Sequence, residues 1–595
     1  MATNPQHLAA LRKTMKNQKL DGFIIPLTDE HMSEYVGSYA QRLAWATGFT
    51  GSAGNAVVLA DKAAVFIDGR YTIQVAEELD DTLVEWHHFE EYPLLNWVCD
   101  NTAATKRIGY DPELVTISWE KLAKAKLSAS NIQLVAIENN PIDEAWADQP
   151  APSLAPLFTQ PEKYAGSTPN DKRALVANAL KDQGADAAVI GMLDSVAWAL
   201  NIRSSDVHCT PVPHAFAIMG ADEQAILFVD ERKVDDAVRV HLGNFVRLEP
   251  RSAFYSELEK LGKAGKKILL DPATNNARIF QTLNAAGATV IEGQDPCILP
   301  KARKNKTEQQ GSRDAHLRDG AAVSEFLCWL EKEAPKGTVD ELGAAAKLLE
   351  FRKKRALLKD ISFNTISGSG PNGALPHYSV SEASNRTLEM DEIYLVDSGG
   401  QYLDGTTDIT RTVIVGTPSA EMKDRYTRVL RGHIALATTR FPKGTSGMAL
   451  DSFARRPLWE AGLDFDHGTG HGVGSFLAVH EGPQRIAKFG TGVPLEEGMI
   501  LSNEPGYYKE GSYGIRIENL ILVKACNGNE ERTMFEFETL TFAPIDHNLI
   551  DASALNPAEL KWLNDYHAAV YEKLESLVDS ETKPWLEKAT KAMVP

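Results

Sequence analysis

Two segments of the last third of the chain decide its fold: Ile393-Tyr-Leu-Val-Asp-Ser-Gly-Gly400 and Thr407-Asp-Ile-Thr-Arg-Thr-Val-Ile-Val415. The first predicts an apolar strand that ends in an acid, and the second a strand that starts with one. A hairpin-like turn over the glycine-rich residues 398–405 would bring Asp397 and Asp408 together. Two carboxylates that meet on a buried sheet repel strongly unless one is protonated or a cation lies between them. The hairpin therefore predicts a perturbed acid pair or a cation site.

A second pair of acids lies further along the chain. Glu504 follows the apolar segment Met499-Ile-Leu-Ser-Asn503, and Glu518 is embedded in Gly514-Ile-Arg-Ile-Glu-Asn-Leu-Ile-Leu-Val523. If the latter is one continuous strand, its two-residue period puts Arg516 and Glu518 on the same face. A salt bridge or a strand-end hydrogen bond explains each acid taken singly. Four acids in four apolar strands favour a shared site.

Between the two acidic pairs stands Phe465-Asp-His-Gly-Thr-Gly-His-Gly-Val-Gly-Ser-Phe-Leu-Ala-Val-His-Glu-Gly482, which holds three histidines. It contains no H-E-x-x-H, and Val473 breaks the dinucleotide-binding pattern G-x-G-x-x-G. The alternating glycines instead predict close approach of another backbone; they are Gly468, Gly470, Gly472 and Gly474. Four carboxylates and one neutral imidazole balance two divalent cations in formal charge. Hard oxygen ligands with a single nitrogen suit Mn²⁺, with Zn²⁺ or Co²⁺ as competitors.

The first half of the chain contains an internal repeat with a period of about 160 residues. Three segments recur: residues 15–25 at 180–190, 43–45 at 196–198, and 65–68 at 227–230. A repeat of this length predicts two α/β domains of similar plan and not a solenoid. It also makes the basic N-terminal segment the first helix of the first domain, against the alternative of a mitochondrial transit peptide.

Two connectors divide the chain into three predicted domains. The Pro-rich residues 149–156 are typical of an extended linker, and we interpret the basic run 299–306 as a solvated linker in preference to a binding patch. A long helix is predicted over 308–333. Another is predicted after Asn556, with an apolar face that docks on the core in preference to a subunit interface. The predicted domains are 1–155, 156–303 and 304–595.

Composition restricts the classes of partner. The 595 residues include 62 Lys and Arg against 81 Asp and Glu, and the net charge of -19 opposes non-specific attraction to nucleic acid or anionic lipid. No run of about 18 apolar residues predicts a membrane span. Five widely spaced cysteines without a C-x-x-C pair indicate a reducing compartment. We therefore expect no nucleic-acid partner and no membrane partner.

The motifs LVDSGG, DGTTDITRT, HGTGHGVG, SNEPGYY and GIRIENL, in this order, resemble those of the pita-bread metallopeptidases, the family of methionine aminopeptidase, prolidase and aminopeptidase P. GFTGSAG at 48–54, DGRY at 68–71 and LPHY at 375–378 extend the resemblance to the long, three-domain, cytosolic Xaa-Pro aminopeptidases. The fold implied combines α/β and α+β parts. Two related N-terminal α/β domains of the creatinase type precede a pita-bread catalytic domain with a C-terminal helical extension.

The resemblance also implies roles for individual residues. The implied ligands of a two-metal centre are Asp397, Asp408, His471, Glu504 and Glu518. Glu504 would also accept and return a proton, His377, His467 and His480 would act on the substrate, Arg516 would orient a ligand carboxylate, and Arg70 would bind substrate from the first domain. The implied activity is hydrolysis of the bond before a proline in the second position of a peptide, by a metal-bridged water or hydroxide.

Related activities remain open at this stage. A prolidase would use the same metals on Xaa-Pro dipeptides, although its usual chain is shorter and lacks the duplicated front domains. Creatinase, and the histone-chaperone relative of the fold, should lack the metal ligands. The partners implied are peptides with an N-terminal Xaa-Pro and a second copy of the chain in a homodimer, and the implied location is cytoplasmic.

Overall fold

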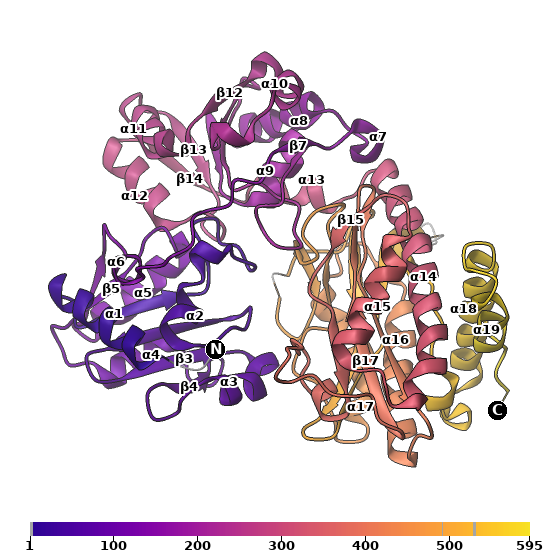
Figure 1. Ribbon diagram of the computed structural model, residues 1–595. Helices are drawn as coiled ribbons and strands as arrows, with labels where there is room; N and C mark the ends of the chain where they lie inside the picture. Colours follow the sequence, from indigo (N-terminus) through magenta and orange to yellow (C-terminus); the bar gives the residue numbers. More distant parts are fainter. Residues whose placement is uncertain (1–3, 491, 527–530, 595) are drawn as a thin grey trace. The chain divides into compact units, whose positions relative to one another are not determined.

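The computed structural model describes residues 4–490, 492–526 and 531–594. The chain forms two compact units (Figure 1). Unit 1 comprises the residues up to 162 together with 167–298, and unit 2 comprises 163–166 and the residues from 299 onward. Among the described residues, no helix combines the length and the apolar character that crossing a bilayer requires.

The first domain of unit 1 is built on a six-stranded sheet in the order β4-β3-β2-β1-β5-β6. Helix α1 (Pro5–Asn17) begins where the Asn4 side chain accepts a hydrogen bond from the backbone of Gln6. Its apolar face buries Leu8, Leu11 and Met15 in the core of this domain. The strands are β1 (Gly22–Pro26), β2 (Gly54–Leu59), β3 (Ala63–Ile67), β4 (Glu85–His88), β5 (Arg107–Tyr110) and β6 (Gln133–Ala136), and the other helices are α2 (Arg42–Thr47), α3 (Thr72–Glu78), α4 (Leu94–Asn101), α5 (Ile117–Ala129) and α6 (Pro141–Ala145). The basic N-terminal segment is thus a packed helix, as predicted.

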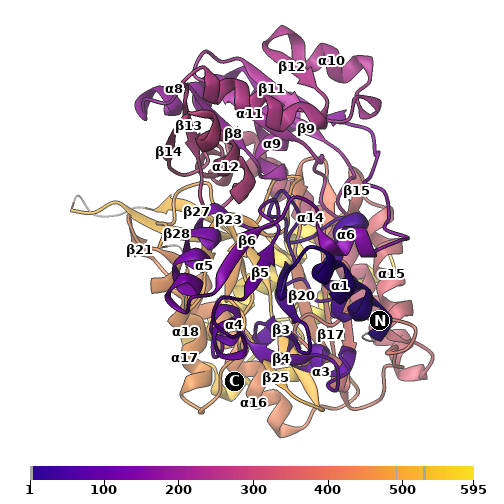
Figure 2. The same cartoon turned by 90° about the vertical axis from the view of Figure 1, so that its left-hand side faces the viewer.

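The second domain repeats this plan, with a sheet in the order β12-β11-β10-β8-β13-β14 (Figure 2). In both sheets the first strand is antiparallel to the second and parallel to the fifth. The strands are β8 (Ala187–Ile190), β10 (Phe216–Gly220), β11 (Ala225–Phe228), β12 (Val246–Glu249), β13 (Lys267–Leu270) and β14 (Thr289–Glu292), flanked by α8 (Pro169–Asp182), α9 (Leu193–Leu200), α10 (Asp236–Leu242), α11 (Phe254–Lys263) and α12 (Ala277–Ala286). Short pieces complete the connections: β7 (Phe158–Thr159), β9 (Ile202–Arg203), α7 (Glu162–Ala165) and α13 (Ile298–Ala302). The predicted pair of related α/β domains is confirmed.

The longest helix of the described part of unit 2 is α14 (Lys306–Glu333), which starts at a capping box between Asn305 and Glu308 and is buried along most of its length. This confirms the helix predicted over 308–333. The sheets of unit 2 run β15-β18-β19, β16-β17-β20, β21-β28-β27-β24-β22-β23 and β25-β26. Their strands are β15 (Leu358–Ile361), β16 (Ile366–Ser369), β17 (Glu392–Ser398), β18 (Gly400–Tyr402), β19 (Gly405–Thr406), β20 (Ile409–Val415), β21 (Phe441–Pro442), β22 (Gly470–Gly472), β23 (Glu481–Ile486), β24 (Ile500–Asn503), β25 (Gly506–Lys509), β26 (Tyr513–Arg516), β27 (Asn519–Cys526) and β28 (Met534–Thr539). The remaining helices are α15 (Glu341–Lys353), α16 (Ala420–Ala437), α17 (Asp451–Trp459), α18 (Pro557–Leu574) and α19 (Thr582–Ala589).

The predicted acidic hairpin is present, because β17 and β20 are antiparallel neighbours with Asp397 opposite Thr410. The residues between them are not a simple turn. They form β18 and β19, which pair with each other and with β15 in a separate small sheet. The connection is therefore a second hairpin that leaves the first sheet and returns to it.

The prediction of one continuous strand over 514–523 is wrong. Strand β26 ends at Arg516 and β27 begins at Asn519. Between them the backbone N–H of Ile517 donates to Pro505 O (3.3 Å) and that of Glu518 donates to Thr410 O (3.2 Å). The chain uses these bonds to leave the two-stranded sheet and enter the six-stranded one, so Glu518 lies at the break.

The closing helix α18 docks on the core, as predicted. It starts at a capping box between Asn556 and Glu559, and its buried face packs into the main apolar cluster of unit 2 through Leu563, Tyr566, Val570 and Leu574. Figure 1 shows α18 (yellow) alongside α14 (rose), in agreement with the contacts between these helices.

The interpretation of residues 299–306 as a solvated linker is wrong for two of its lysines. Lys301 and Lys304 are 2% and 3% exposed. Both contact the buried carboxylate of Glu481, with 3.0 Å between Lys301 Nζ and Glu481 Oε2. A buried carboxylate requires positive partners, and the basic run supplies them.

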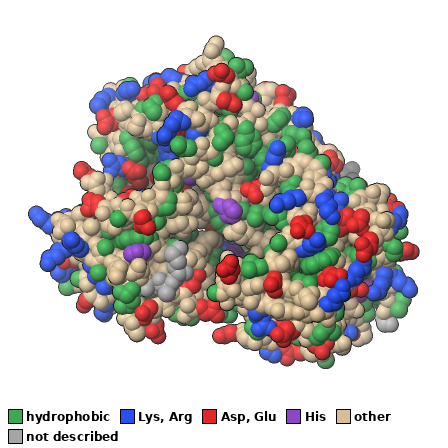
Figure 3. All heavy atoms as spheres, in the orientation of Figure 1, with side chains coloured by type: hydrophobic (Ala, Val, Ile, Leu, Met, Phe, Trp, Pro, Cys, Tyr) green, Lys and Arg blue, Asp and Glu red, His purple; other side chains and the backbone are tan. Residues whose placement is uncertain are grey.

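On the face of the molecule drawn in Figure 3, Lys and Arg side chains are interspersed with Asp and Glu side chains.

Candidate metal centre

The structure gathers the five predicted ligands from five different positions in unit 2. Asp397 lies in β17, Asp408 just before β20, His471 in β22, Glu504 just after β24, and Glu518 between β26 and β27. One ligand atom each of Asp408, His471 and Glu518 lie within 4.8 Å of one another. His471 Nε2 is 3.5 Å from both Asp408 Oδ2 and Glu504 Oε1.

The carboxylates of this group perturb one another. Burial, followed by repulsion from Asp397 and Glu504, raises the pKa of Asp408 well above its usual range. Burial and repulsion from the other three carboxylates do the same to the pKa of Glu518. Asp397 Oδ1 is buried and accepts no hydrogen bond from the described residues. The cluster therefore holds more negative charge than its side-chain neighbours compensate.

The orientation of His471 suits a ligand. Its Nδ1 lies 3.0 Å from the carbonyl oxygen of Gly472. Because a carbonyl only accepts, Nδ1 carries the hydrogen and Nε2 presents its lone pair to the carboxylates. The Ser502 hydroxyl accepts from the backbone N–H of His471 (2.9 Å) and donates to Glu504 Oε1 (3.2 Å). One serine thus orients two of the five residues.

Three of the four glycines around this histidine are required by close packing. A Cβ at Gly470 would lie 2.0 Å from Ser502 O, one at Gly472 would lie 2.1 Å from Glu481 O, and one at Gly474 would lie 2.8 Å from Ala478 O. The predicted close backbone approach is confirmed at these positions. At Gly468 the nearest atom would be 3.5 Å away, so an alanine there meets only ordinary contact.

Arg516 links the cluster to His467 through a tyrosine. Arg516 Nη2 donates to Asp397 Oδ2 (2.7 Å) and Nη1 to the hydroxyl of Tyr508 (2.5 Å). The Tyr508 hydroxyl lies 2.8 Å from His467 Nε2, while His467 Nδ1 lies 2.7 Å from Gly468 O. The carbonyl fixes the hydrogen on Nδ1, so Tyr508 donates to Nε2. His467 is 8% exposed, and both of its ring nitrogens are engaged. It is therefore connected to the carboxylate cluster through Tyr508 and Arg516. Sequence reasoning missed Tyr508, although it ends the SNEPGYY motif.

The other two predicted histidines occupy different settings. His480 is half-buried, and its ring centroid lies 4.3 Å from that of His471 at an interplanar angle of 70°. His377 is half-buried in the turn after the 3₁₀ helix η7 (Gly370–Ala374), a segment that packs against β17 and β26. The structure therefore brings His480 beside His471 of the cluster, and it packs the η7 segment that precedes His377 against the strands that carry Asp397 and Arg516.

Arg70 belongs to unit 1. Asp68 caps the short 3₁₀ helix η2 (Gly69–Tyr71), and its carboxylate also binds the guanidinium of Arg70, with 2.7 Å between Oδ2 and Nη2. The repeat keeps this turn in the second domain, where Asp230 caps η3 (Glu231–Lys233) and binds Arg232. Contact between Arg70 and substrate stays a prediction.

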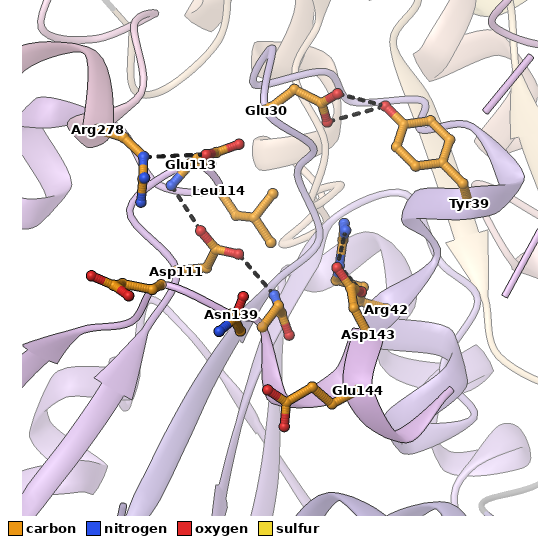
Figure 4. Close-up of a pocket in the computed structure, with 12 residues that line it drawn as sticks. Glu30, Tyr39, Arg42, Asp111, Glu113, Leu114, Asn139, Asp143, Glu144 and Arg278 are labelled. Atoms are coloured by element: carbon orange, nitrogen blue, oxygen red, sulfur yellow. Dashed lines mark hydrogen bonds and ion pairs between the residues drawn. The ribbon is translucent and has the colours of Figure 1, made fainter. Parts of the chain in front are cut away.

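Unit 1 also contains an acidic pocket of about 470 Å³, drawn in Figure 4. Three of its carboxylates are paired with neighbouring donors. Asp143 binds Arg42 Nε at 2.7 Å, Asp111 accepts from Asn140 at 2.9 Å, and Glu30 accepts from the Tyr39 hydroxyl at 3.0 Å. None of the predicted site residues lines this pocket. In the cluster of unit 2, by contrast, Asp397 Oδ1 has no hydrogen-bond partner among the described residues.

Comparison with known protein families distinguishes the same parts of the chain. The model described as metallopeptidase family M24 matches residues 310–525. Two models described as the creatinase/prolidase N-terminal domain match 7–144 and 148–308, and the C-terminal region of peptidase M24 matches 533–593. The M24 match covers all five residues of the cluster, and the two N-terminal matches cover the two repeated domains.

Individual relatives match over nearly the whole chain. Aminopeptidase P2 of Arabidopsis thaliana is 42% identical over 95% of this chain and 85% of its own length. A probable Xaa-Pro aminopeptidase P of Laccaria bicolor is 41% identical over 98% of this chain and 92% of its own. Among solved structures, the X-prolyl aminopeptidase of Caenorhabditis elegans, described as a cytosolic enzyme with a di-nuclear active site, superposes with a TM-score of 0.94 at 34% identity, covering 99% of both chains.

Proposed function

The chain belongs to metallopeptidase family M24, and we propose that it removes the N-terminal residue from peptides whose second residue is proline. One structural observation carries the proposal: four carboxylates and one imidazole converge in unit 2 with an excess of negative charge. Relatives that match the whole length, duplicated front domains included, carry Xaa-Pro aminopeptidase names. Prolidase, the alternative, is less supported for this reason.

The residues of the cluster fit a pair of divalent cations. Asp397, Asp408, Glu504 and Glu518 offer hard oxygen donors, His471 offers one nitrogen lone pair, and the buried Asp397 Oδ1 has no hydrogen-bond partner among the described residues. We propose these five as the ligands, with Mn²⁺ as the favoured ion and Zn²⁺ or Co²⁺ as alternatives. Bound cations of this kind supply a nucleophilic water at neutral pH and polarise the scissile carbonyl.

Glu504 is the proposed proton carrier among the ligands. Its side chain is less buried than those of Asp408 and Glu518, and Ser502 holds one of its oxygens. An acceptor at the open side of the cluster can take a proton from the attacking water and return it to the leaving nitrogen. Arg516 fixes the direction of the Asp397 carboxylate through their 2.7 Å contact.

Recognition of the bond before proline depends on side chains that do not need an amide hydrogen. The nitrogen of that bond belongs to the proline ring and carries no N–H. His480, half-buried beside His471, can donate to the scissile carbonyl oxygen as negative charge develops on it. His377 is assigned to the residues that flank the scissile bond of the peptide. His467 acts on the metal centre indirectly, through its hydrogen bond with Tyr508 and the bond between Tyr508 and Arg516.

The proposal extends to oligomeric state and location. Several large apolar side chains of unit 2 are exposed on α17, just before it and after β23; they are Met448, Phe453, Trp459 and Phe489. We propose that they form one apolar patch of the kind typical of a protein interface. They support a homodimer. A cytoplasmic location is supported by the description of the nematode relative as cytosolic and by five free cysteines.

The test uses purified enzyme that is stripped with a chelator and restored with Mn²⁺. We expect release of the first residue from Xaa-Pro-Yaa tripeptides and longer Xaa-Pro peptides, no cleavage of proline-free controls, and loss of activity when the N-terminus is acetylated. Dipeptides should not be the preferred class. Faster turnover of Xaa-Pro dipeptides than of every tripeptide would replace the proposal with prolidase, and indifference to acetylation would indicate an endopeptidase.

A further inference from the structure

Arg411 is a fully buried guanidinium with six hydrogen-bond acceptors among the described residues, and none of these six is a carboxylate. It is 1% exposed. Its acceptors are Thr410 O (2.9 Å), Glu518 O (2.7 Å), Asn519 Oδ1 (2.9 Å), Ala543 O (3.0 Å), Pro544 O (3.0 Å) and the hydroxyl of Tyr566 (2.8 Å). Burying a charge is costly unless all its hydrogens are bonded. Arg411 meets this condition by tying together backbone from several parts of unit 2.

The acceptors fall into two groups. Thr410, which follows Asp408 by two residues, and Glu518 belong to the strand ends that carry the proposed ligands. Thr410 also donates from its hydroxyl to Glu518 Oε2 (2.8 Å). The other group lies in the C-terminal region, where the Tyr566 hydroxyl on α18 accepts from Arg411 and lies 3.0 Å from Ala543 O. Arg411 therefore connects the backbone of the carboxylate cluster to helix α18.

His433 of α16 adds a parallel connection between the two glutamate ligands. Its Nδ1 donates to Asn503 O (3.1 Å), and its Nε2 accepts from Asn519 Nδ2 (3.2 Å). Asn503 and Asn519 are opposite each other in the β24–β27 ladder. Since Asn503 precedes Glu504 and Asn519 follows Glu518, one buried imidazole fixes the spacing of the two backbone positions from which these glutamates project.

We propose that the C-terminal region sets the geometry of the metal centre, with Tyr566 and Arg411 as positioning residues for Asp408 and Glu518. The inference rests on the proposed function, since it concerns the ligands assigned there. Residues that hold metal ligands in place typically contribute about 10- to 100-fold to metal affinity. Arg411 Nη2 has two hydrogens and three acceptors, Asn519 Oδ1, Ala543 O and the Tyr566 hydroxyl. Removal of that hydroxyl therefore leaves each N–H bonded but breaks the direct link between α18 and Arg411, and we expect the attached strand ends to relax.

The experiment compares Tyr566→Phe with Tyr571→Phe, a half-buried tyrosine of the same helix that packs against the same apolar cluster. Mn²⁺ is titrated calorimetrically into each metal-free full-length protein, and the visible spectrum of the Co²⁺-loaded form reports ligand geometry. We expect about tenfold weaker Mn²⁺ binding and an altered Co²⁺ spectrum for Tyr566→Phe, and wild-type values for Tyr571→Phe. Arg411→Lys, which keeps the charge but has fewer donors, should lose more affinity.

Thermal unfolding of the same variants separates positioning from general stability. If Tyr566→Phe lowers the unfolding temperature but leaves Mn²⁺ affinity and the Co²⁺ spectrum unchanged, the hydroxyl is merely structural and the inference is overturned. If Arg411→Lys fails to fold, the single-hydroxyl change Tyr566→Phe keeps the inference testable. Failure of the wild-type protein to bind divalent cations would instead overturn the proposed function itself.

Discussion

The two units each contain a cluster of carboxylates, and the clusters differ in how their charge is balanced. In the pocket of unit 1, Asp143 is bound by Arg42, Asp111 by Asn140, and Glu30 by Tyr39 and Arg251. In unit 2, burial and mutual repulsion raise the pKa of Asp408 and Glu518 well above the usual range. These three pocket carboxylates each have a donor on a neighbouring side chain, whereas Asp397 Oδ1 of the metal centre has none among the described residues.

The difference shows what distinguishes a cation site from an acidic surface. Acidic residues are common in both units, so their number alone predicts little. What marks the cluster in unit 2 is the shortage of compensating donors, with Asp397 Oδ1 buried and without a hydrogen-bond partner among the described residues. Buried charge of this kind is tolerated when a cation completes the site. The comparison can be tested by removing charge from each cluster in turn.

The largest effect is expected from Asp408→Asn. The substitution removes one ligand and one negative charge from the centre, so we expect activity to fall by about 10³-fold or more and metal content to drop. Asp143→Asn is the matched control, since it removes a carboxylate of the pocket that Arg42 already satisfies. It should lower stability while leaving metal content and activity near wild type. Elemental analysis and tripeptide turnover measure both; equal metal loss in the two variants would erase the distinction between the clusters.

A smaller effect is expected at the edge of the metal centre. His480→Ala should lower kcat by about 10²–10⁴-fold, because the imidazole is assigned to the substrate and not to the cations. Metal content should remain that of the wild type. A variant that loses its metal but keeps normal activity per bound metal would make His480 part of the ligand set and enlarge the cluster by one residue.

The repeat supplies a matched pair for testing whether unit 1 takes part in catalysis. Arg70 and Arg232 occupy equivalent turns, each bound to the aspartate two residues before it, but their side chains are 22% and 70% exposed. We expect Arg70→Ala to raise KM for tripeptides by about tenfold, as for loss of a charged hydrogen bond, and Arg232→Ala to have no effect. If both variants have wild-type kinetics, the role predicted for Arg70 is wrong.

Much of the fold could be predicted from patterns that local physics enforces. The repeat, helix α14, the capping box of α18 and the β17–β20 hairpin depend on apolar spacing and end-capping residues that are visible in the sequence. The break at Ile517 and Glu518 could not be predicted. Both residues continue an unbroken strand pattern, and the hydrogen bonds to Pro505 and Thr410 that interrupt it come from distant segments.

The candidate site, like the fold, could be predicted only in part from the sequence. The five proposed ligands follow from motifs in the sequence, and the structure gathers them. The supporting residues are harder to find, because Tyr508, Arg411 and His433 act through contacts across strands and helices. Lys301 and Lys304 show the same limit, since a basic run next to a domain boundary is indistinguishable from a linker until Glu481 is found between the two amines.

The smallest effect is expected on stability, from substitution of Glu113 in the acidic pocket of unit 1. Burial, followed by repulsion from Asp111, raises the pKa of Glu113 to about 7. A carboxyl whose pKa is raised on folding contributes stability that is fully present below its unfolded pKa of about 4.3 and is lost as pH rises through 7. Glu113→Gln should therefore match the wild type near pH 4.5 and exceed its stability at pH 8 by about 1 kcal/mol, after allowance for solvent screening.

Thermal unfolding at the two pH values measures this difference, with Asp143→Asn as the control that loses stability at both. The nearest opposing influence is Arg278, whose Nε lies 3.4 Å from Glu113 Oε1. If Glu113→Gln is instead less stable than the wild type at pH 8, this ion pair outweighs the cost of burial. The charge of Glu113 would then be compensated as well as that of Asp143. The two clusters would differ more in charge compensation than the raised pKa of Glu113 indicates.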